Sequence, residues 1–218
     1  MARQPIATAI TLLIATTSAS AAELSDADVE NIVRRSCQYV AMYNVNNKCA
    51  KEQVGGWNKF LADTQLKDHT LKVIARPNND TLYIVSMLDV RKEPVVLEIP
   101  AFDSEYISLM VCGYDHYVSI PLSTRLGDFK KPTRLLVYTS RTEGYDGKPV
   151  DGIDRVFEGT GDFLQATVRV MPHATDPERY ERIVKQMDSF TLMTLSEYRG
   201  GTARPIDDID FPSVGTTD

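Results

Sequence analysis

The sequence has few of the residues that mark metal, redox or nucleotide chemistry. Its 218 residues include three histidines, three cysteines and one tryptophan. The cysteines and histidines form no C-x-x-C or H-x-x-x-H pair and no dense His-x-His cluster, so we expect no metal site. A G-x-S-x-G elbow, a phosphate-binding glycine loop and a dinucleotide fingerprint are also missing. The sequence therefore predicts no cofactor, and no motif in it names a reaction.

A basic surface is missing as well. Lys and Arg total 24 against 30 Asp and Glu, which gives a formal net charge of -6. Proteins that bind nucleic acid neutralise phosphates with a basic stripe, and no cluster of Lys and Arg provides one here. Hydrophobic residues at 43% and charged residues at 25% are typical of a globular chain with a sizeable core. We expect no nucleic-acid partner.

The N-terminus has the three parts of a signal peptide in order. Arg3 precedes an apolar run over residues 6–15, and Ala19 and Ala21 follow at the A-x-A spacing of a cleavage site. Ten helical residues rise about 15 Å, half of a bilayer core, so this run is too short for a permanent anchor. No later segment is apolar enough to span a membrane. Residues 1–21 therefore predict a signal peptide and an exported protein, periplasmic or secreted. A disordered or amphipathic N-terminus is the alternative.

Export would permit a disulfide, and Cys37 and Cys49 are the nearest pair in sequence. In one continuous helix their Cα atoms would lie about 18 Å apart, which is beyond the reach of a disulfide. A bridge therefore requires the chain to turn within the asparagine-rich stretch 44–47. Both possibilities remain open from the sequence.

Hydrophobic periodicity predicts a helical segment, a β-domain and a tail. In residues 22–70, a helix begins at Ser25, carries an apolar face as far as Val40 and is expected to lie on a sheet. A short second helix is expected over 58–66. Residues 71–198 contain the strand patterns and then a helix that begins at Asp176-Pro177. The expected strands cover 70–75, 82–90, 95–99, 106–112, 134–139 and 163–171. The fold class is therefore mainly β (α+β), an antiparallel, jelly-roll-like β-sandwich with an N-terminal and a C-terminal helix packed on it. Residues 199–218 form an extended acidic tail.

Several motifs then carry a family resemblance. The run RPNNDTLY over residues 76–83 is followed by Leu-Asp at 88–89 and by Pro-Val-Val at 94–96. Further matches are GYDHY at 113–117, GDF at 127–129 and RVMPH at 169–173. In this order the motifs resemble the domain of unknown function 1254. The resemblance implies an exported bacterial protein with a jelly-roll-like core. It also implies a partner domain, 1214, which usually follows and is missing here.

The same motifs supply the candidate ligand-binding residues, which are Asn78, Asp80, Thr81, Tyr83, Arg169 and Trp57. The first four can line a pocket at one end of the sandwich, or they can simply form a turn with its polar atoms satisfied. Arg169 can hold a ligand carboxylate, although an internal salt bridge is the alternative role. Trp57 can cover a pocket or belong to the core.

Candidate catalytic residues are His116 with Asp115, and His173. A carboxylate can orient an imidazole as a general base, but neighbours on a strand point to opposite faces. Asp115 and His116 would therefore need a turn at Gly113 or Tyr114. We expect a protein that recognises a small molecule. One alternative is an enzyme that uses these histidines for acid–base or metal chemistry. The other is an interaction module that forms a homo-oligomer or pairs with the missing C-terminal domain.

Overall fold

The computed structural model describes residues 24–72 and 76–207. The expected signal peptide over residues 1–21 lies outside the described residues. The chain divides into two compact units, Met1–Ser36 and Cys37–Asp218. Both β-sheets belong to the second unit. None of the described helices has the length and apolar character needed to cross a bilayer.

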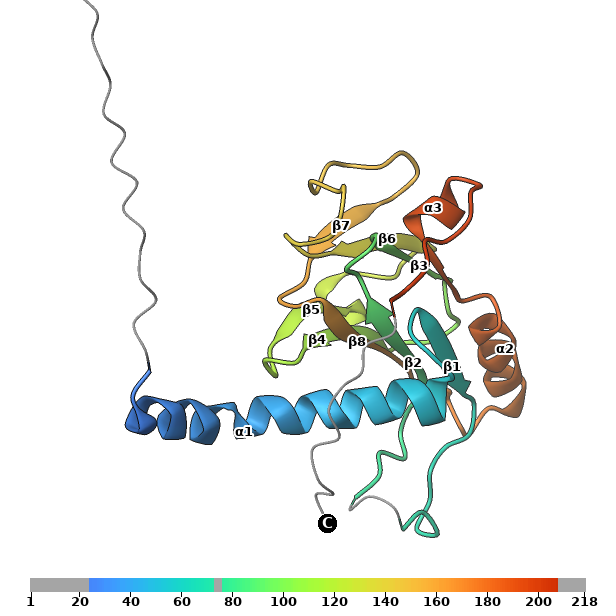
Figure 1. Cartoon of the computed structure of the whole chain (residues 1–218). Coiled ribbons are helices and arrows are strands. Elements are labelled where there is room, and N and C mark those ends of the chain that lie inside the picture. The colour runs from blue at the N-terminus through green and yellow to red at the C-terminus, as the bar shows by residue number, and fades with distance from the viewer. Residues whose placement is uncertain (1–23, 73–75, 208–218) are drawn as a thin grey trace, which may run out of the picture. The chain divides into compact units, whose positions relative to one another are not determined.

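The larger sheet has five strands, all antiparallel to their neighbours, in the order β1-β2-β8-β4-β5 (Figure 1). Its strands are β1 (Lys59–Asp63), β2 (Leu82–Asp89), β4 (Ile107–Gly113), β5 (Val118–Ser123) and β8 (Phe163–Val170). The central strand, β8, pairs with β2 on one side and with β4 on the other. In that register Arg169 lies between Tyr83 of β2 and Ser108 of β4.

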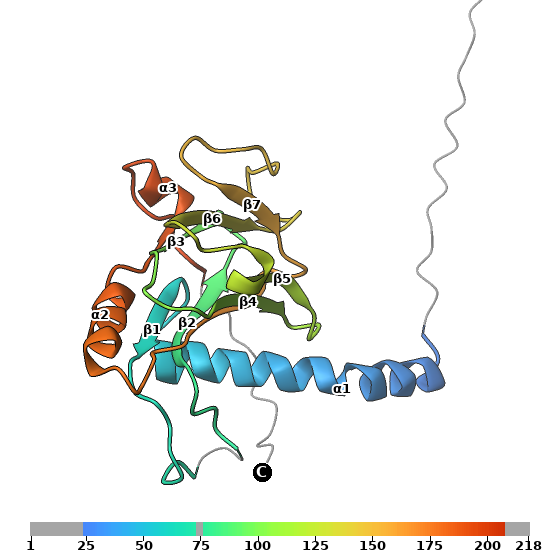
Figure 2. The ribbon, with the colours of Figure 1, turned by 180° about the vertical axis from the view of Figure 1, so that it is seen from behind.

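The smaller sheet has four strands in the order β7-β6-β3-β9. They are β3 (Val95–Ile99), β6 (Thr133–Tyr138), β7 (Arg155–Glu158) and β9 (Thr191–Thr194), and only the β6–β7 pair is parallel. The short helix α3 (Leu195–Tyr198) follows β9 and begins with a capping box between Thr194 and Glu197. Its buried Leu195 packs with Val96 and Leu136 on one face of this sheet. Figure 2 shows both sheets from behind.

The main core lies between the two sheets, where alternate residues of each strand meet. On β8 the four inward residues Leu164, Ala166, Val168 and Val170 are almost fully buried. Helix α2 (Pro177–Met187) adds Ile183 and Met187 to this core. Asp176 caps the N-terminus of α2 by accepting a hydrogen bond from Arg179 N at 3.0 Å. The mainly β, α+β class and the two-sheet arrangement with N- and C-terminal helices are confirmed.

Helix α1 (Asp26–Lys48) runs without a break into a π-helical segment, η1 (Cys49–Val54), which ends where Gly55 adopts a φ of 84°. The chain does not turn at residues 44–47. Cys37 and Cys49 therefore lie about 18 Å apart on one helical run, and both are free. On the part of α1 that belongs to the first unit, the side chains of Val29, Ile32 and Val33 are exposed.

The expected helix over residues 58–66 is also wrong, since Lys59–Asp63 form strand β1. Asn58 has a left-handed φ of 53°, and its side chain bonds both the N–H and the C=O of Asp89, at 2.8 and 3.0 Å. These bonds align the following residues with β2, so they pair as a strand. The expected strand over 70–75 is not formed by residues 70–72, and 73–75 lie outside the described residues.

The tail after α3 is held against the β2–β3 turn as far as it is described. The carboxylate of Glu93 is buried and accepts hydrogen bonds from Ser196 N at 2.9 Å and Arg204 N at 2.6 Å. Lys92 Nζ lies 2.9 Å from the Asp207 carboxylate. The chain turns at residues 199–201, where Gly200 has a φ of 82°, and residues 202–207 form no helix or strand. Residues 208–218 of the expected tail lie outside the described residues.

Candidate ligand-binding site

The outward face of the central strand carries a line of polar side chains. Because strand residues alternate, burying 164, 166, 168 and 170 turns Gln165, Thr167 and Arg169 to the opposite side of the sheet. No hydrogen bond joins these three side chains to another group within the described residues. A central strand with three unused hydrogen-bonding side chains is well suited to contact a ligand. We call this set the β8 polar line.

Arg169 is the charged member of the β8 polar line. Its guanidinium carbon lies 5.5 Å from the ring centroid of Tyr83, its neighbour across the β2–β8 pair. Its Nε is buried and has no hydrogen-bond partner. Among residues 24–72 and 76–207, no carboxylate forms an ion pair with it, so the internal salt bridge considered from the sequence is not found there. The ring of Tyr83 holds the guanidinium in place while its hydrogen-bonding capacity stays unused.

The PNNDT segment forms the turn that leads into β2. Asn78 Oδ1 accepts from Asp80 N at 2.7 Å, and Asn78 Nδ2 donates to Thr81 Oγ1 at 3.3 Å. Thr81 is buried, whereas the side chains of Asn78 and Asp80 are exposed. The structure therefore brings Tyr83 and Arg169 together and places the Asn78–Thr81 turn immediately before Tyr83. The polar atoms of Asn78 serve this turn.

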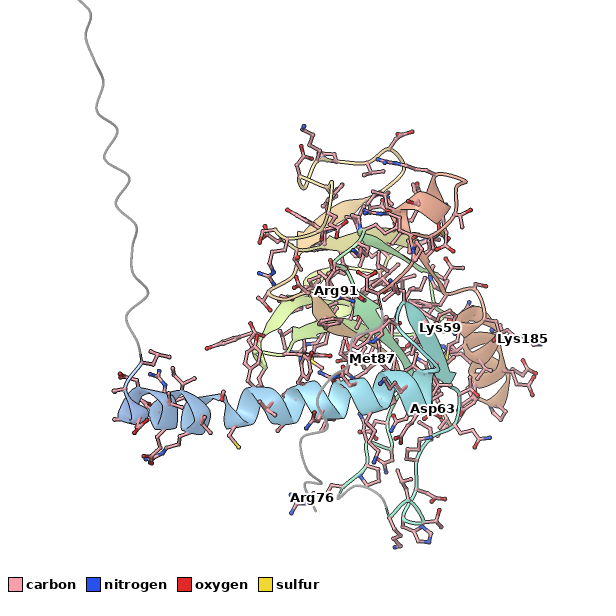
Figure 3. The ribbon with its side chains drawn as sticks, in the orientation of Figure 1. Lys59, Asp63, Arg76, Met87, Arg91 and Lys185 are labelled. Carbon is pink, nitrogen blue, oxygen red and sulfur yellow. The ribbon has the colours of Figure 1, made fainter. Side chains whose placement is uncertain are left out.

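Apolar side chains flank the β8 polar line. Val85 of β2 and Met110 of β4 lie on either side of Thr167, and Met87 and Cys112 lie on either side of Gln165. Met87 is fully buried, and Figure 3 labels it. Burial raises the pKa of the Cys112 thiol, Asp115 raises it further and Arg169 opposes the shift. Cys112 is therefore a protonated, weakly polar neighbour at neutral pH.

An aromatic cluster lies at the other end of this face, around Phe163 at the start of β8. The ring of Phe163 lies 4.9 Å from Trp57, 5.9 Å from Tyr114 and 6.4 Å from Tyr43 of α1, between centroids. The Arg91 guanidinium carbon lies 4.9 Å from the same centroid. Trp57 thus packs in this cluster on Phe163, which is six strand positions from Arg169.

Asp115 and His116 lie in the hairpin between β4 and β5. A turn at this point was the condition for their cooperation, and it is present: His116 N donates to Gly113 O at 3.3 Å and His116 has a φ of 67°. Asp115 Oδ1 accepts from Tyr117 N at 3.1 Å, a bond that stabilises the hairpin. His116 is exposed. A catalytic role for this pair stays a prediction.

His173 lies in the loop between β8 and α2, with a φ of 53°. Its Nε2 accepts from Glu105 N at 3.2 Å, and its Nδ1 lies 3.3 Å from Arg179 Nη1. These contacts link the loop before β4 to the start of α2. His173 follows the C-terminal end of β8 and His116 that of β4, so these antiparallel strands separate the two histidines by about 20 Å. They cannot share a metal ion. No group of three His, Cys, Asp or Glu side chains suited to a metal occurs in the described parts of the chain.

Two adjoining surface pockets lie elsewhere in the sandwich. One of about 540 Å³ is lined by the ends of β3 and β6, and one of about 430 Å³ by residues 127–131. None of the six expected ligand-binding residues is among those lining either pocket. Their charged walls are largely self-paired, because Arg134 lies 2.5 Å from Glu98 and Arg155 lies 2.9 Å from Asp128. Arg169 differs from Arg134 and Arg155 because no carboxylate of the described residues pairs with it.

The sequence prediction named Tyr83 and Arg169 as ligand-binding residues but did not name Gln165 and Thr167, which share their face of the sheet. The available signal was the alternation of residues 163–171, which already placed these two side chains on the outward face. The sequence prediction also did not name Asn46 and Asn47, which are buried on α1. The asparagine-rich stretch that contains them had been interpreted as a possible turn. An asparagine pair inside a helix is unfavourable for helix propensity, and that was the usable signal of another role.

The fold and this face define a mainly β, two-sheet protein with a polar line on the central strand of its larger sheet. The chain belongs to the family described as protein of unknown function (DUF1254), whose model matches residues 57–193. No curated protein matches the sequence.

Two solved structures are similar to this chain. The VPA0106 protein from Vibrio parahaemolyticus has 23% sequence identity and a TM-score of 0.63 over 80% of this chain. This chain spans 40% of the length of the Vibrio protein, and the likeness shows the fold. An uncharacterized protein from Burkholderia cenocepacia has 16% identity and a TM-score of 0.41, over 85% of this chain and 46% of that one.

Proposed function

We propose that this protein binds a small molecule carrying a carboxylate or another anionic group, on the outer face of its five-stranded sheet. The observation that carries the proposal is the buried Nε of Arg169, for which residues 24–72 and 76–207 provide no hydrogen-bond partner. A buried donor left unsatisfied is costly, and a charge-assisted bond from guanidinium to carboxylate is among the stronger hydrogen bonds in proteins. An anionic ligand would satisfy this donor.

The surroundings of Arg169 support the same ligand chemistry. Tyr83 orients the guanidinium, so little side-chain entropy would be lost on binding. Gln165 and Thr167 offer further donors and acceptors on the same strand. Apolar flanking residues such as Val85 and Met110 would cover the body of the ligand.

The test compares wild-type protein with Arg169→Gln by thermal unfolding, against a panel of small carboxylates, inorganic phosphate and sulfate. Arg155→Gln is a matched control, because Arg155 also lies over an aromatic ring, Phe157, but already has Asp128 as a partner. We expect at least one anion to raise the Tm of wild type and of Arg155→Gln by about 5 °C or more at a hundredfold excess over Kd. Arg169→Gln should show no such rise. An equal rise in Arg169→Gln would refute the proposal.

We also propose that the protein is exported, on the strength of its N-terminal sequence. Expression in a bacterial host followed by fractionation and mass measurement of the mature chain tests this. Cleavage after Ala21 is expected, and an uncleaved chain that stays in the cytoplasm would overturn it.

The enzymatic alternative makes a separate prediction about the histidines. If His116 or His173 performs acid–base chemistry on the bound molecule, its replacement by alanine should abolish turnover and leave affinity intact. Under the binding proposal, His116→Ala has the same anion-induced rise in Tm as wild type, and no anion of the panel is converted to another product.

A further inference from the structure

The structure has a small set of buried side-chain donors that lack partners. Within the described residues they are Arg169 Nε and the side-chain amide nitrogens of Asn46 and Asn47. Asn46 and Asn47 are 2% and 7% exposed, so bulk water does not reach their side chains freely. Most buried polar groups in native proteins are satisfied, so these three unused donors call for an explanation.

Asn46 and Asn47 belong to the stretch of α1 that packs on the five-stranded sheet. Tyr43, one turn earlier, contacts Tyr114 with a centroid distance of 5.1 Å, and η1, which follows, contacts β1 and β2. The hydroxyl of Tyr114 donates to Asn47 Oδ1 at 3.1 Å. That bond fixes the amide, so Asn47 Nδ2 is left as the unused donor.

Gln165 and Thr167 of the β8 polar line lie between Arg169 and Phe163 on β8. Arg169 lies in the row of Tyr83 and Ser108, whereas Tyr114 stacks on Phe163 at the other end of β8. Arg169 and Phe163 are six positions apart on β8, which is about 20 Å along the strand between their Cα atoms. The rows between them contain Val85 and Met110, then Met87 and Cys112, beside the polar line. The face is therefore apolar at its middle flanks and has donors at both ends.

We infer that this face takes an elongated molecule with an anionic group at one end and a second hydrogen-bond acceptor at the other. The anion would bind Arg169, the apolar body would lie along β8, and the distal acceptor would receive hydrogen bonds from Asn46 and Asn47. Guanidinium nitrogens and the amide nitrogen of asparagine only donate, so both ends of the ligand must accept. Unbranched α,ω-dicarboxylates are the simplest members of this class. This inference rests on the proposed function, because it assumes the anion site at Arg169.

The test measures Kd by titration calorimetry for a series of unbranched α,ω-dicarboxylates and for monocarboxylates of the same chain lengths, with the full chain. One dicarboxylate length should bind about tenfold or more tightly than its monocarboxylate. Asn46→Leu and Asn47→Leu should each remove that preference and leave monocarboxylate affinity unchanged. Asn31→Leu, an exposed substitution on the same helix, is the control and should keep the preference. Two asparagine variants are used so that misfolding of one, visible by circular dichroism, leaves the other to decide.

The outcomes separate this inference from the proposed function. If Arg169→Gln weakens both classes of acid about tenfold or more but no length shows a preference, only the distal acceptor is refuted. The same conclusion follows if Asn46→Leu and Asn47→Leu keep the preference. If Arg169→Gln binds every acid with the wild-type Kd, the proposed anion site is refuted, and this inference is refuted with it.

Discussion

The buried carboxylates of the described residues, Asp89 and Glu93, are both hydrogen-bonded, which makes Arg169 an exception. Asp89 is 3% exposed, and Arg91 donates to it from Nε at 2.9 Å and from Nη2 at 2.7 Å. Glu93 is 5% exposed and accepts from two backbone N–H groups. Burial of a charge is tolerated when such bonds replace its hydration. The unused Nε of Arg169 is therefore a local property of the outer face and not a general feature of the molecule.

Replacing Asp89 should be strongly destabilising. Asp89→Asn removes the buried partner of Arg91 without a change in size, so the free energy of unfolding should fall by about 3–5 kcal/mol. Urea denaturation followed by Trp57 fluorescence measures this. Asp146→Asn is the control, since Asp146 pairs with Lys148 on the surface at 2.6 Å and should contribute less than about 1 kcal/mol. Similar losses in the two variants would contradict the buried pairing.

Asn46→Leu should change the free energy of unfolding in the opposite direction, by stabilising the protein. In the protein without ligand, the substitution removes an unsatisfied donor and retains a side chain of similar volume. The free energy of unfolding should therefore rise by about 1 kcal/mol, up to about 3. The midpoint of urea denaturation, measured in ligand-free buffer, checks this. A clear loss of stability would mean that a buried water already satisfies the amide.

At the scale of elements, the strands predicted best are those whose two faces differ most. Residues 163–171 alternate apolar and polar side chains, and β8 follows that pattern because one face meets the core. Strands β5, β7 and β9 were not predicted. β5 contains Pro121, which an edge strand tolerates, and β7 and β9 have four residues each. β1 depends on the long-range hydrogen bonds of Asn58 to Asp89, which no local sequence pattern reveals.

The proximity of Tyr83 and Arg169 in the candidate site was not predictable either. It depends on the register of β2 against β8, which the spacing of residues in the sequence does not determine.

The tail element should detach as the pH falls. Burial by itself would raise the pKa of Glu93, but hydrogen bonds from Ser196, Arg204 and Thr194 outweigh it, so the pKa lies below its ordinary value of 4.5. A lowered carboxyl pKa contributes stability above pH 4.5 that is lost as the pH falls through the folded-state value. The stability difference between wild type and Glu93→Gln should therefore be constant from pH 7 to about 5 and shrink below pH 4.5. Urea midpoints across this range measure it, and a constant difference down to pH 3 would disprove it.

At the scale of the whole molecule, the N-terminal part of α1 has exposed apolar side chains. Val29, Ile32 and Val33 are 46%, 52% and 63% exposed at neighbouring positions of one helical face. The expectation of an interaction module, with a second copy or a partner domain, remains a proposal that this surface supports. The chain spans 40% of the Vibrio protein that shares its fold.

This surface should be dispensable for folding. Ile32→Ser and Val33→Ser should change the free energy of unfolding by less than about 0.5 kcal/mol, because neither side chain is buried. If the face mediates self-association, light scattering should give a larger mass for wild type than for the double variant. Ser36→Ala on the same helix is the control. A double variant that fails to fold would show that these residues belong to a core.

The central position of β8 has a consequence for how the chain folds. β8 joins β2 and β4, yet it is synthesised about eighty residues after β2 begins and about fifty after β4 ends. The five-stranded sheet thus has no continuous ladder until residues 163–170 insert between strands made much earlier. Pairings of such large sequence separation slow folding, because the intervening loops must be ordered first. The strand that carries Arg169 is therefore also the one whose insertion completes the sheet, so the proposed anion site and the larger sheet should form in the same kinetic step.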